Sequence, residues 1–188
     1  MGAMSPYAVR IVGDPVLRQK AAPVVDIDAK MHKLVEDMFT TMYAAPGIGL
    51  AAPQVGVQKR FFVFDMGDDE GGQQVLINPE ITGSDGEWTY EEGCLSVPGR
   101  YFEITRPKQI EITGRDLDGN EVSFEADELL ARLMQHELDH LDGVLLLDHL
   151  DADQAKDAKK FVRELQMQQY DDAQAELAPR KRLGLRLR

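Results

Sequence analysis

The sequence contains a single cysteine, no long apolar run and an excess of acidic over basic residues. One cysteine, Cys94, cannot form an internal disulfide, which suits a reducing cytoplasm. No apolar stretch approaches the roughly 20 residues that span a bilayer, and the first residues lack the basic and apolar regions of a signal peptide. Acidic residues outnumber basic ones 33 to 21, and the formal net charge of −12 argues against a general binder of DNA or RNA. We therefore expect a cytoplasmic protein with no membrane or DNA partner.

The length of the chain and the absence of internal repeats or long linkers predict one folded domain. A chain of 188 residues is long enough to bury a core, and it has no internal repeat or long linker. We expect a single domain over residues 1–178, a basic tail over 179–188 that need not be ordered, and a monomer.

Three segments have the pattern of helices. Apolar residues recur at i, i+3 and i+4 after Asp28, and this segment should end at 45–47, where a proline and a glycine follow. Asp127 and Gly143 suit the two ends of a central helix that is apolar over a wide arc, as expected of a buried helix. A C-terminal helix is expected over about 153–175.

Short β-branched and aromatic segments predict strands over 60–65, 74–78, 109–113 and 121–125. Asp118–Gly119–Asn120 is a turn that would join the last two as a hairpin. Short strands joined by hairpins favour an α+β fold, with antiparallel or mixed sheets packed around the central helix.

The central helix contains His136-Glu137-Leu138-Asp139-His140, which matches H-E-x-x-H. Two histidines four residues apart lie on nearly the same helical face, so both imidazoles can reach one metal ion. Glu137 lies beside them, where a carboxylate can take a proton from a metal-bound water. A catalytic site of this kind needs a third protein ligand and an open position.

The third ligand distinguishes the classes of metalloenzyme. Leu146 stands where a metzincin would carry its third histidine, and His149 is out of register and expected at the surface. Cys94 is the leading candidate, since a thiolate with two imidazoles is a plausible catalytic set. Two alternatives remain open at this point: Cys94 could pack as a small buried hydrophobe, or a downstream acid such as Glu164 could complete a metallopeptidase site.

A glycine-rich segment, 47–57, carries Gln54 as its only polar side chain. With the segment 92–96 it gives three motifs in order: G-I-G-L-A-A-x-Q, E-G-C-L-S and Q-H-E-x-D-H-L. Together they resemble peptide deformylase, a family that removes the formyl group from the N-terminal formyl-methionine of nascent polypeptides.

The resemblance implies a role for each motif. Cys94, His136 and His140 would hold the metal, and a metal-bound water would attack the formyl carbonyl with Glu137 as general base and acid. The side-chain amide of Gln54 and the backbone N–H of Leu95 would stabilise the oxyanion. The family points to Fe(II) as the metal, although the ligand set also suits Zn(II), Ni(II) or Co(II).

The resemblance also implies how an N-formyl-methionyl peptide binds. Its backbone would pair with the segment formed by Ile48, Gly49 and Leu50 as an added strand. Its methionine side chain would enter a pocket lined by Ile48, Leu129 and Leu133. Arg132 departs from the apolar residue that many relatives carry, and we expect its stem to cover the pocket while its head reaches solvent.

Further residues are expected to support the ligands. By family position, Glu92 and Arg106 would form a pair that braces the strand of Cys94. Asp139 is a candidate partner for a ligand imidazole.

The C-terminal end suggests a macromolecular partner. Residues 180–188 include five Lys or Arg and no acid. Relatives with an extended C-terminal helix use it to dock on the ribosome, so the helix and tail could bind near the exit site. A non-catalytic ribosome-associated module is the remaining alternative, disfavoured because Glu137, Gln54 and all three ligands are present.

Overall fold

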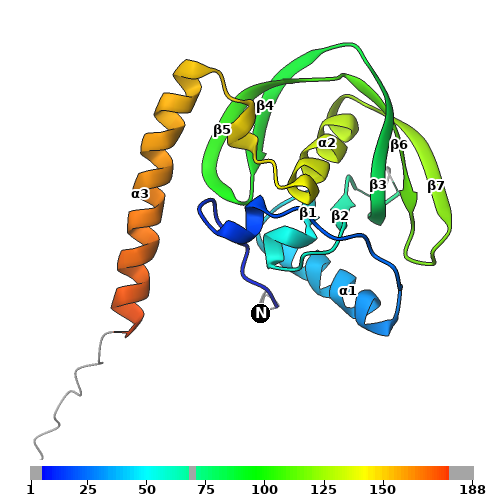
Figure 1. The fold of residues 1–188 in the computed structure, drawn as a ribbon, viewed down its shortest axis with the longest axis horizontal. Helices are drawn as coiled ribbons and strands as arrows, with labels where there is room; N and C mark the ends of the chain where they lie inside the picture. Colours follow the sequence, from blue (N-terminus) through cyan, green and yellow to red (C-terminus); the bar gives the residue numbers. More distant parts are fainter. Residues whose placement is uncertain (1–5, 68–70, 178–188) are drawn as a thin grey trace, which may run out of the picture.

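The computed structural model describes residues 6–67 and 71–177, which form an antiparallel sheet, a separate hairpin and three α-helices (Figure 1). The elements, in chain order, are η1 (Pro15–Arg18), α1 (Ala29–Ala44), β1 (Gly49–Ala51), η2 (Ala52–Val55), β2 (Phe61–Asp65), β3 (Gln73–Asp85), β4 (Trp88–Cys94), β5 (Val97–Arg106), β6 (Gln109–Arg115), β7 (Glu121–Asp127), α2 (Glu128–Asp142), η4 (Leu146–His149) and α3 (Ala152–Leu177). The expected α+β class is confirmed.

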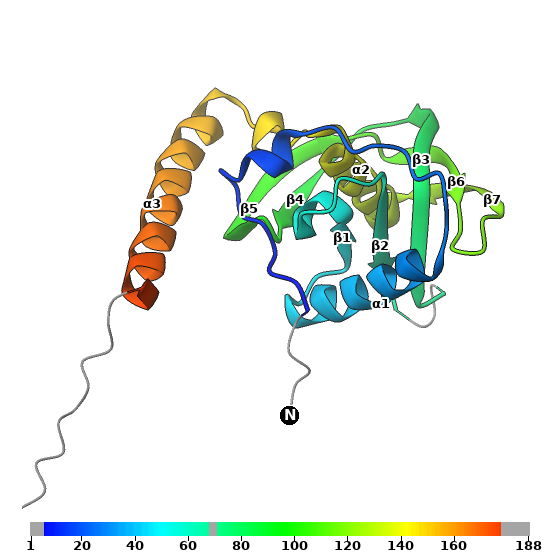
Figure 2. The same ribbon diagram turned by 60° about the horizontal axis from the view of Figure 1, so that its bottom comes forward.

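The main sheet has five strands in the order β1-β2-β3-β6-β7, with every neighbouring pair antiparallel. Strand β2 shows how both helices are held, because its alternate side chains enter two different cores. Phe62 and Phe64 pack with residues of α2, whereas Phe61 and Val63 pack with residues of α1. The two helices therefore cover opposite faces of this sheet (Figures 1 and 2).

The helix ends follow from local sequence, as predicted. The Asp28 side chain accepts a hydrogen bond from the Met31 N–H at 2.9 Å, and Asp127 accepts one from the Glu128 N–H at 2.7 Å. Gly143 ends α2 at φ +73°, a left-handed conformation that glycine adopts without strain. The cap residues at both ends set where α2 begins and ends, and this sets the positions of His136 and His140 along the helix.

The four predicted strands are all present, and 74–78 lies within the longer β3. The pattern did not reveal β1, β4 and β5 as strands. β4 and β5 pair only with each other, and most of their residues are at least partly exposed. Such strands show little of the apolar alternation by which strands are found in a sequence.

Helix α3 extends along one side of the body (Figure 1). Its inner stripe, Phe161, Val162 and Leu165, packs on a core that includes Leu145 and Leu146. Its bounds, Ala152–Leu177, agree with the expected 153–175. Within the described ranges, no helix combines the length and apolar character needed to cross a bilayer.

Candidate metal centre

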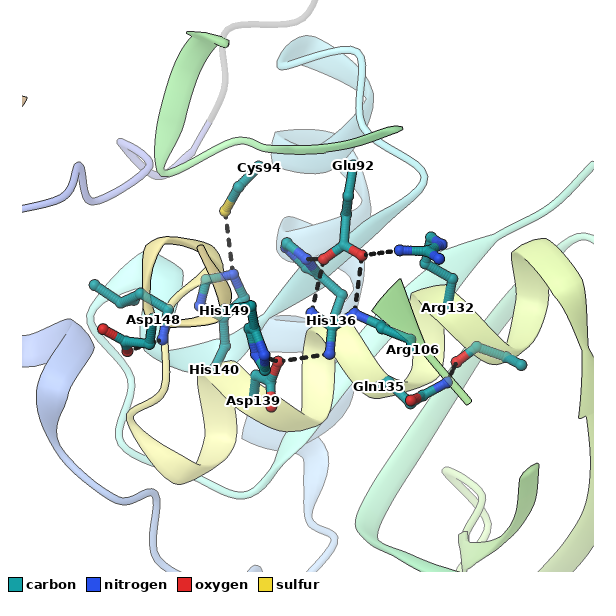
Figure 3. Close-up of polar contacts among 12 residues, drawn as sticks. Glu92, Cys94, Arg106, Arg132, Gln135, His136, Asp139, His140, Asp148 and His149 are labelled. Carbon is teal, nitrogen blue, oxygen red and sulfur yellow. Dashed lines mark hydrogen bonds and ion pairs between the residues drawn. The ribbon is translucent and has the colours of Figure 1, made fainter. Parts of the chain in front are cut away.

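Three residues from two elements converge on one point. Cys94 ends strand β4 at the tip of the β4–β5 hairpin, and His136 and His140 lie one turn apart on α2. The ligand atoms of the three lie within 4.8 Å of one another, and Cys94 Sγ is 3.3 Å from His140 Nε2 (Figure 3). The geometry therefore brings together the three residues expected to bind metal.

The donors are of chemical types that suit a divalent ion. Burial by itself raises the pKa of Cys94, but His140 and His136 lower it well below that of an ordinary thiol. His136 Nδ1 lies 2.6 Å from Glu92 Oε1, which leaves its other ring nitrogen facing the cluster. One thiolate and two imidazoles match the donor set of catalytic zinc and related sites. The residues present fit such an ion.

The competing third ligands lie elsewhere. Leu146 is fully buried in an apolar core. Glu164 is exposed on α3, where its carboxylate lies 4.0 Å from Lys160 Nζ. Of the three candidates, Cys94 is the one that lies beside the two histidines.

Glu92 is the carboxylate that orients His136. It is 6% exposed, and both of its oxygens also accept hydrogen bonds from Arg106, at 2.7 and 2.9 Å. The expected pair of Glu92 and Arg106 is therefore present. Burial raises the pKa of Glu92, but the hydrogen bonds from His136 and Arg106 outweigh it and lower that pKa strongly. A carboxylate fixed in this way holds the imidazole ring in one orientation.

Asp139 occupies a different place from the one expected. Instead of a ligand imidazole, its carboxylate accepts from Arg106 Nη1 at 2.9 Å and lies 2.7 Å from His149 Nε2 (Figure 3). His149 is exposed at the end of η4, as expected for a surface or helix-end histidine, and through Asp139 it also joins the polar contacts behind His136. Sequence spacing could not show this contact, because it joins α2 to η4 across a turn.

Glu137 is a buried carboxylate beside the three ligands. It is 4% exposed, its Oε2 is buried without a hydrogen-bond partner among the described residues, and burial raises its pKa to about 7. A Cβ placed on Gly49 would lie 2.5 Å from Glu137 Oε1, so only glycine lets strand β1 approach this carboxylate so closely.

Gln54 is buried at 1% exposure beside the ligands. Its Oε1 accepts from the Ala51 N–H at 2.8 Å, and its Nε2 donates to Ser96 Oγ at 3.2 Å and lies 3.8 Å from Cys94 Sγ. These hydrogen bonds hold the amide with its Nε2 on the side of the ligand Cys94. Ser96, which the sequence did not single out, is fully buried in this arrangement.

A cavity of about 510 Å³ opens in front of the ligands. Its lining includes these residues that the sequence singled out: Ile48, Gly49, Gln54, Glu92, Cys94, Leu95, Leu129, Arg132, Leu133, His136 and Glu137. Leu50 does not belong to it: its side chain is fully buried in the core against α1. The expected contribution of Leu50 is therefore limited to its backbone, because alternate side chains of a strand point to opposite faces.

Arg132 also differs from expectation. Its head does not reach solvent: the residue is 3% exposed, and its guanidinium contacts Glu92. The sequence gave no sign of this contact, which links residues 40 positions apart.

Comparison with known proteins gives concordant matches. A family model described as polypeptide deformylase matches residues 6–156. A peptide deformylase of Hydrogenovibrio crunogenus is 47% identical over 153 residues, which cover 81% of this chain and 90% of that protein. The crystal structure of a peptide deformylase from Legionella pneumophila is similar, with a TM-score of 0.81, 39% identity, and coverage of 87% of this chain and 97% of that one. A structure of the Synechococcus elongatus peptide deformylase with actinonin has a TM-score of 0.79, 43% identity, and coverage of 85% and 90%.

Proposed function

The chain belongs to the peptide deformylase family of hydrolases, which remove the N-formyl group from nascent polypeptides, and we propose that it does so with a divalent metal held by Cys94, His136 and His140. The observation that carries the proposal is the convergence of these three ligands at a cavity that Cys94, His136 and the buried Glu137 line. The test is formate release from formyl-methionyl peptides, run beside an assay for cleavage of internal peptide bonds. Cleavage of internal bonds without formate release would point to a metallopeptidase instead.

The bound ion would supply Lewis-acid chemistry, polarising the formyl carbonyl and acidifying a water molecule. The protein's own part is to hold donors in place: α2 provides two imidazoles, and the hairpin tip provides the thiolate. The Ser96 N–H lies 3.4 Å from Cys94 Sγ and favours its thiolate form.

Glu137 is proposed to move the proton. A carboxylate accepts a proton from the attacking water best when its pKa lies near the working pH. Burial raises the pKa of Glu137 to about 7, which also lets the protonated acid release that proton to the departing amine. One side chain can then serve both halves of the reaction.

Gln54 and Leu95 are proposed to stabilise the developing oxyanion. The Gln54 amide nitrogen is already oriented toward the ligands by the Ala51 N–H, which fixes the opposite end of the amide. Leu95 lies at the hairpin turn directly after the ligand Cys94 and lines the cavity, which supports this role for its backbone N–H. Donors fixed in advance stabilise charge without reorganisation.

The formyl-methionyl substrate is proposed to bind as an added strand. β1 is an edge strand of the five-stranded sheet in the described part of the chain, and on its outer side the Ala51 N–H is bonded to Gln54, which leaves the Gly49 part of the strand for pairing. The apolar side chains of Ile48, Leu129 and Leu133 line the cavity and would receive the methionine side chain.

Iron(II) is the metal we propose for the native enzyme, and it predicts sensitivity to oxidants. An iron-loaded preparation should lose activity in peroxide much faster than a nickel-loaded one, because Ni(II) is not readily oxidised. Residual formate release is measured over time at fixed peroxide, with metal content and Cys94 oxidation followed in parallel. Equal half-lives for the two forms would argue against loss at the iron.

Residues 1–178 are proposed as one catalytic domain, and residues 179–188, which lie outside the described residues, as a basic tail that contacts the ribosome. Five cations in the last nine residues would displace counterions from RNA, so binding should weaken steeply with salt. Removal of 179–188 should spare formate release from short peptides and lower co-sedimentation with ribosomes at low salt. Undiminished co-sedimentation of the truncated protein would contradict the proposed contact.

A further inference from the structure

Arg132 lies one helical turn before His136 on α2, with its side chain almost fully enclosed. Its Nη1 donates to Glu92 Oε2 at 2.8 Å (Figure 3). Its Nη2 donates to the Trp88 carbonyl at 2.6 Å. The guanidinium also stacks near two rings, 5.0 Å from the centroid of Trp88 and 6.0 Å from that of Tyr90. One side chain of α2 therefore contacts three residues of β4.

The points of contact on β4 share one face of the strand. Trp88, Tyr90 and Glu92 are separated by two residues each. The pairing of β4 with β5 is irregular between Gly93 and Cys94, and the side chains of Glu92 and Cys94 both point toward α2 (Figure 3). Side chains two apart in a strand point the same way. Arg132 thus holds the face of β4 that also carries the thiolate ligand.

Glu92 is saturated with donors only when Arg132 is present. Oε1 accepts from His136 and Arg106, and Oε2 accepts from Arg106 and Arg132. Without Arg132, the buried Oε2 would keep a single donor, from Arg106, and the carboxylate that orients His136 would be held less firmly.

This hold matters because β4 and β5 form their own two-stranded sheet within the described part of the chain. Cys94 is therefore aligned with His136 and His140 by side chains, and not by a ladder of backbone hydrogen bonds from the main sheet. Arg106 reaches α2 from β5 through Asp139, whereas Arg132 reaches β4 from α2. Both arginines therefore connect the β4–β5 hairpin, which carries Cys94, to helix α2, which carries the two histidines.

We infer that Arg132 is a positioning residue for the metal centre, which locks the hairpin that carries Cys94 onto the helix that carries His136 and His140. The inference rests on the proposed function, because it takes those three residues as the ligands. Arg132 acts through Glu92 and β4, without touching the ion.

The test is the rate at which protein loaded with cobalt(II) releases its metal to an excess of chelator, without substrate. Arg132→Met, which keeps much of the stem but removes the donors, should release cobalt about 10- to 100-fold faster, with an altered thiolate-to-cobalt absorption band. Arg132→Lys should be intermediate, since an ammonium retains the charge but not the planar fork.

Arg60→Met is the matched control. Arg60 also joins a carboxylate and a carbonyl, Asp142 at 2.7 Å and Pro79 O at 3.2 Å, but it binds α2 at its last residue and not through the Glu92 that orients His136. It should leave metal release unchanged, even where it lowers the thermal midpoint of the metal-free protein. Unchanged release in Arg132→Met, or equal acceleration in Arg60→Met, would overturn the inference. If Arg132→Met gives no folded protein, Arg132→Lys decides: release clearly faster than wild type supports it, and wild-type release overturns it.

A double-substitution cycle identifies the route. In a Glu92→Gln background, Arg132→Met should add less to the release rate than it does in the wild type, because both act on the same carboxylate. Full additivity would contradict action through Glu92. Wild-type protein loaded with cobalt is measured first. Absence of a thiolate-to-cobalt absorption band in the wild type would count against the proposed function itself. Release of cobalt at the wild-type rate in every variant would count against this inference alone.

Discussion

Glu137→Gln should lower kcat for formate release by about 10²- to 10⁴-fold, the usual contribution of a general base, and should leave metal content unchanged. The carboxylate is buried in the cavity, and its Oε2 has no hydrogen-bond partner among the described residues, so it is available for proton transfer. Glutamine keeps the shape but cannot accept the proton. Glu137→Ala should have a similar effect on turnover.

Metal content per chain and kcat are measured on the same preparations. Glu128→Gln is the control, because Glu128 is an exposed acid of the first turn of α2 that pairs with Lys108 at 3.2 Å. It should behave as wild type. Wild-type turnover in Glu137→Gln protein that retains its metal would exclude Glu137 as the base.

Cys94→Ser, His136→Ala and His140→Ala should each lose both bound metal and activity. The loss should exceed the roughly 10- to 100-fold typical of removing an outer partner, because each change removes one of three donors. Metal analysis after dialysis, together with formate release, measures the effect. His32→Ala, a change on the exposed side of α1, should retain both.

The cysteine variant is the most informative of the three. Retention of metal by Cys94→Ser would mean that the third ligand lies elsewhere, as in a metallopeptidase that uses an acid such as Glu164. The exposed position of Glu164 on α3 argues against that outcome.

The part of the site that could be predicted is the part set by local geometry. Two histidines four apart must share a helical face, and Asp127 and Gly143 mark the ends of that helix from their own side-chain and backbone preferences. The rest of the arrangement came from family resemblance. The buried setting of Gln54 agrees with that reading, although its role in catalysis stays a prediction.

What could not be predicted depends on contacts between distant segments. The inward turn of Arg132 and the contact of Asp139 with His149 require the hairpin and η4 to be in place before either partner is near. The burial of the Leu50 side chain in the core against α1 was not predicted either, although the expected pairing of its backbone with substrate does not depend on that side chain. Burial on both faces removes the alternation that would have shown which way it points.

The separate β4–β5 hairpin has a consequence for how long the site survives. A segment that shares no strand pairing with the main sheet can open without unfolding the remainder, as an independent cooperative unit of lower stability. The thiolate lies at the tip of this unit, whereas both imidazoles belong to a helix packed in the main core. A metal held by the three proposed ligands would therefore join this hairpin to the helix of the main core. We expect its residence time to follow fluctuations of the hairpin, on the timescale that amide hydrogen exchange of residues 88–106 would report, more than global unfolding.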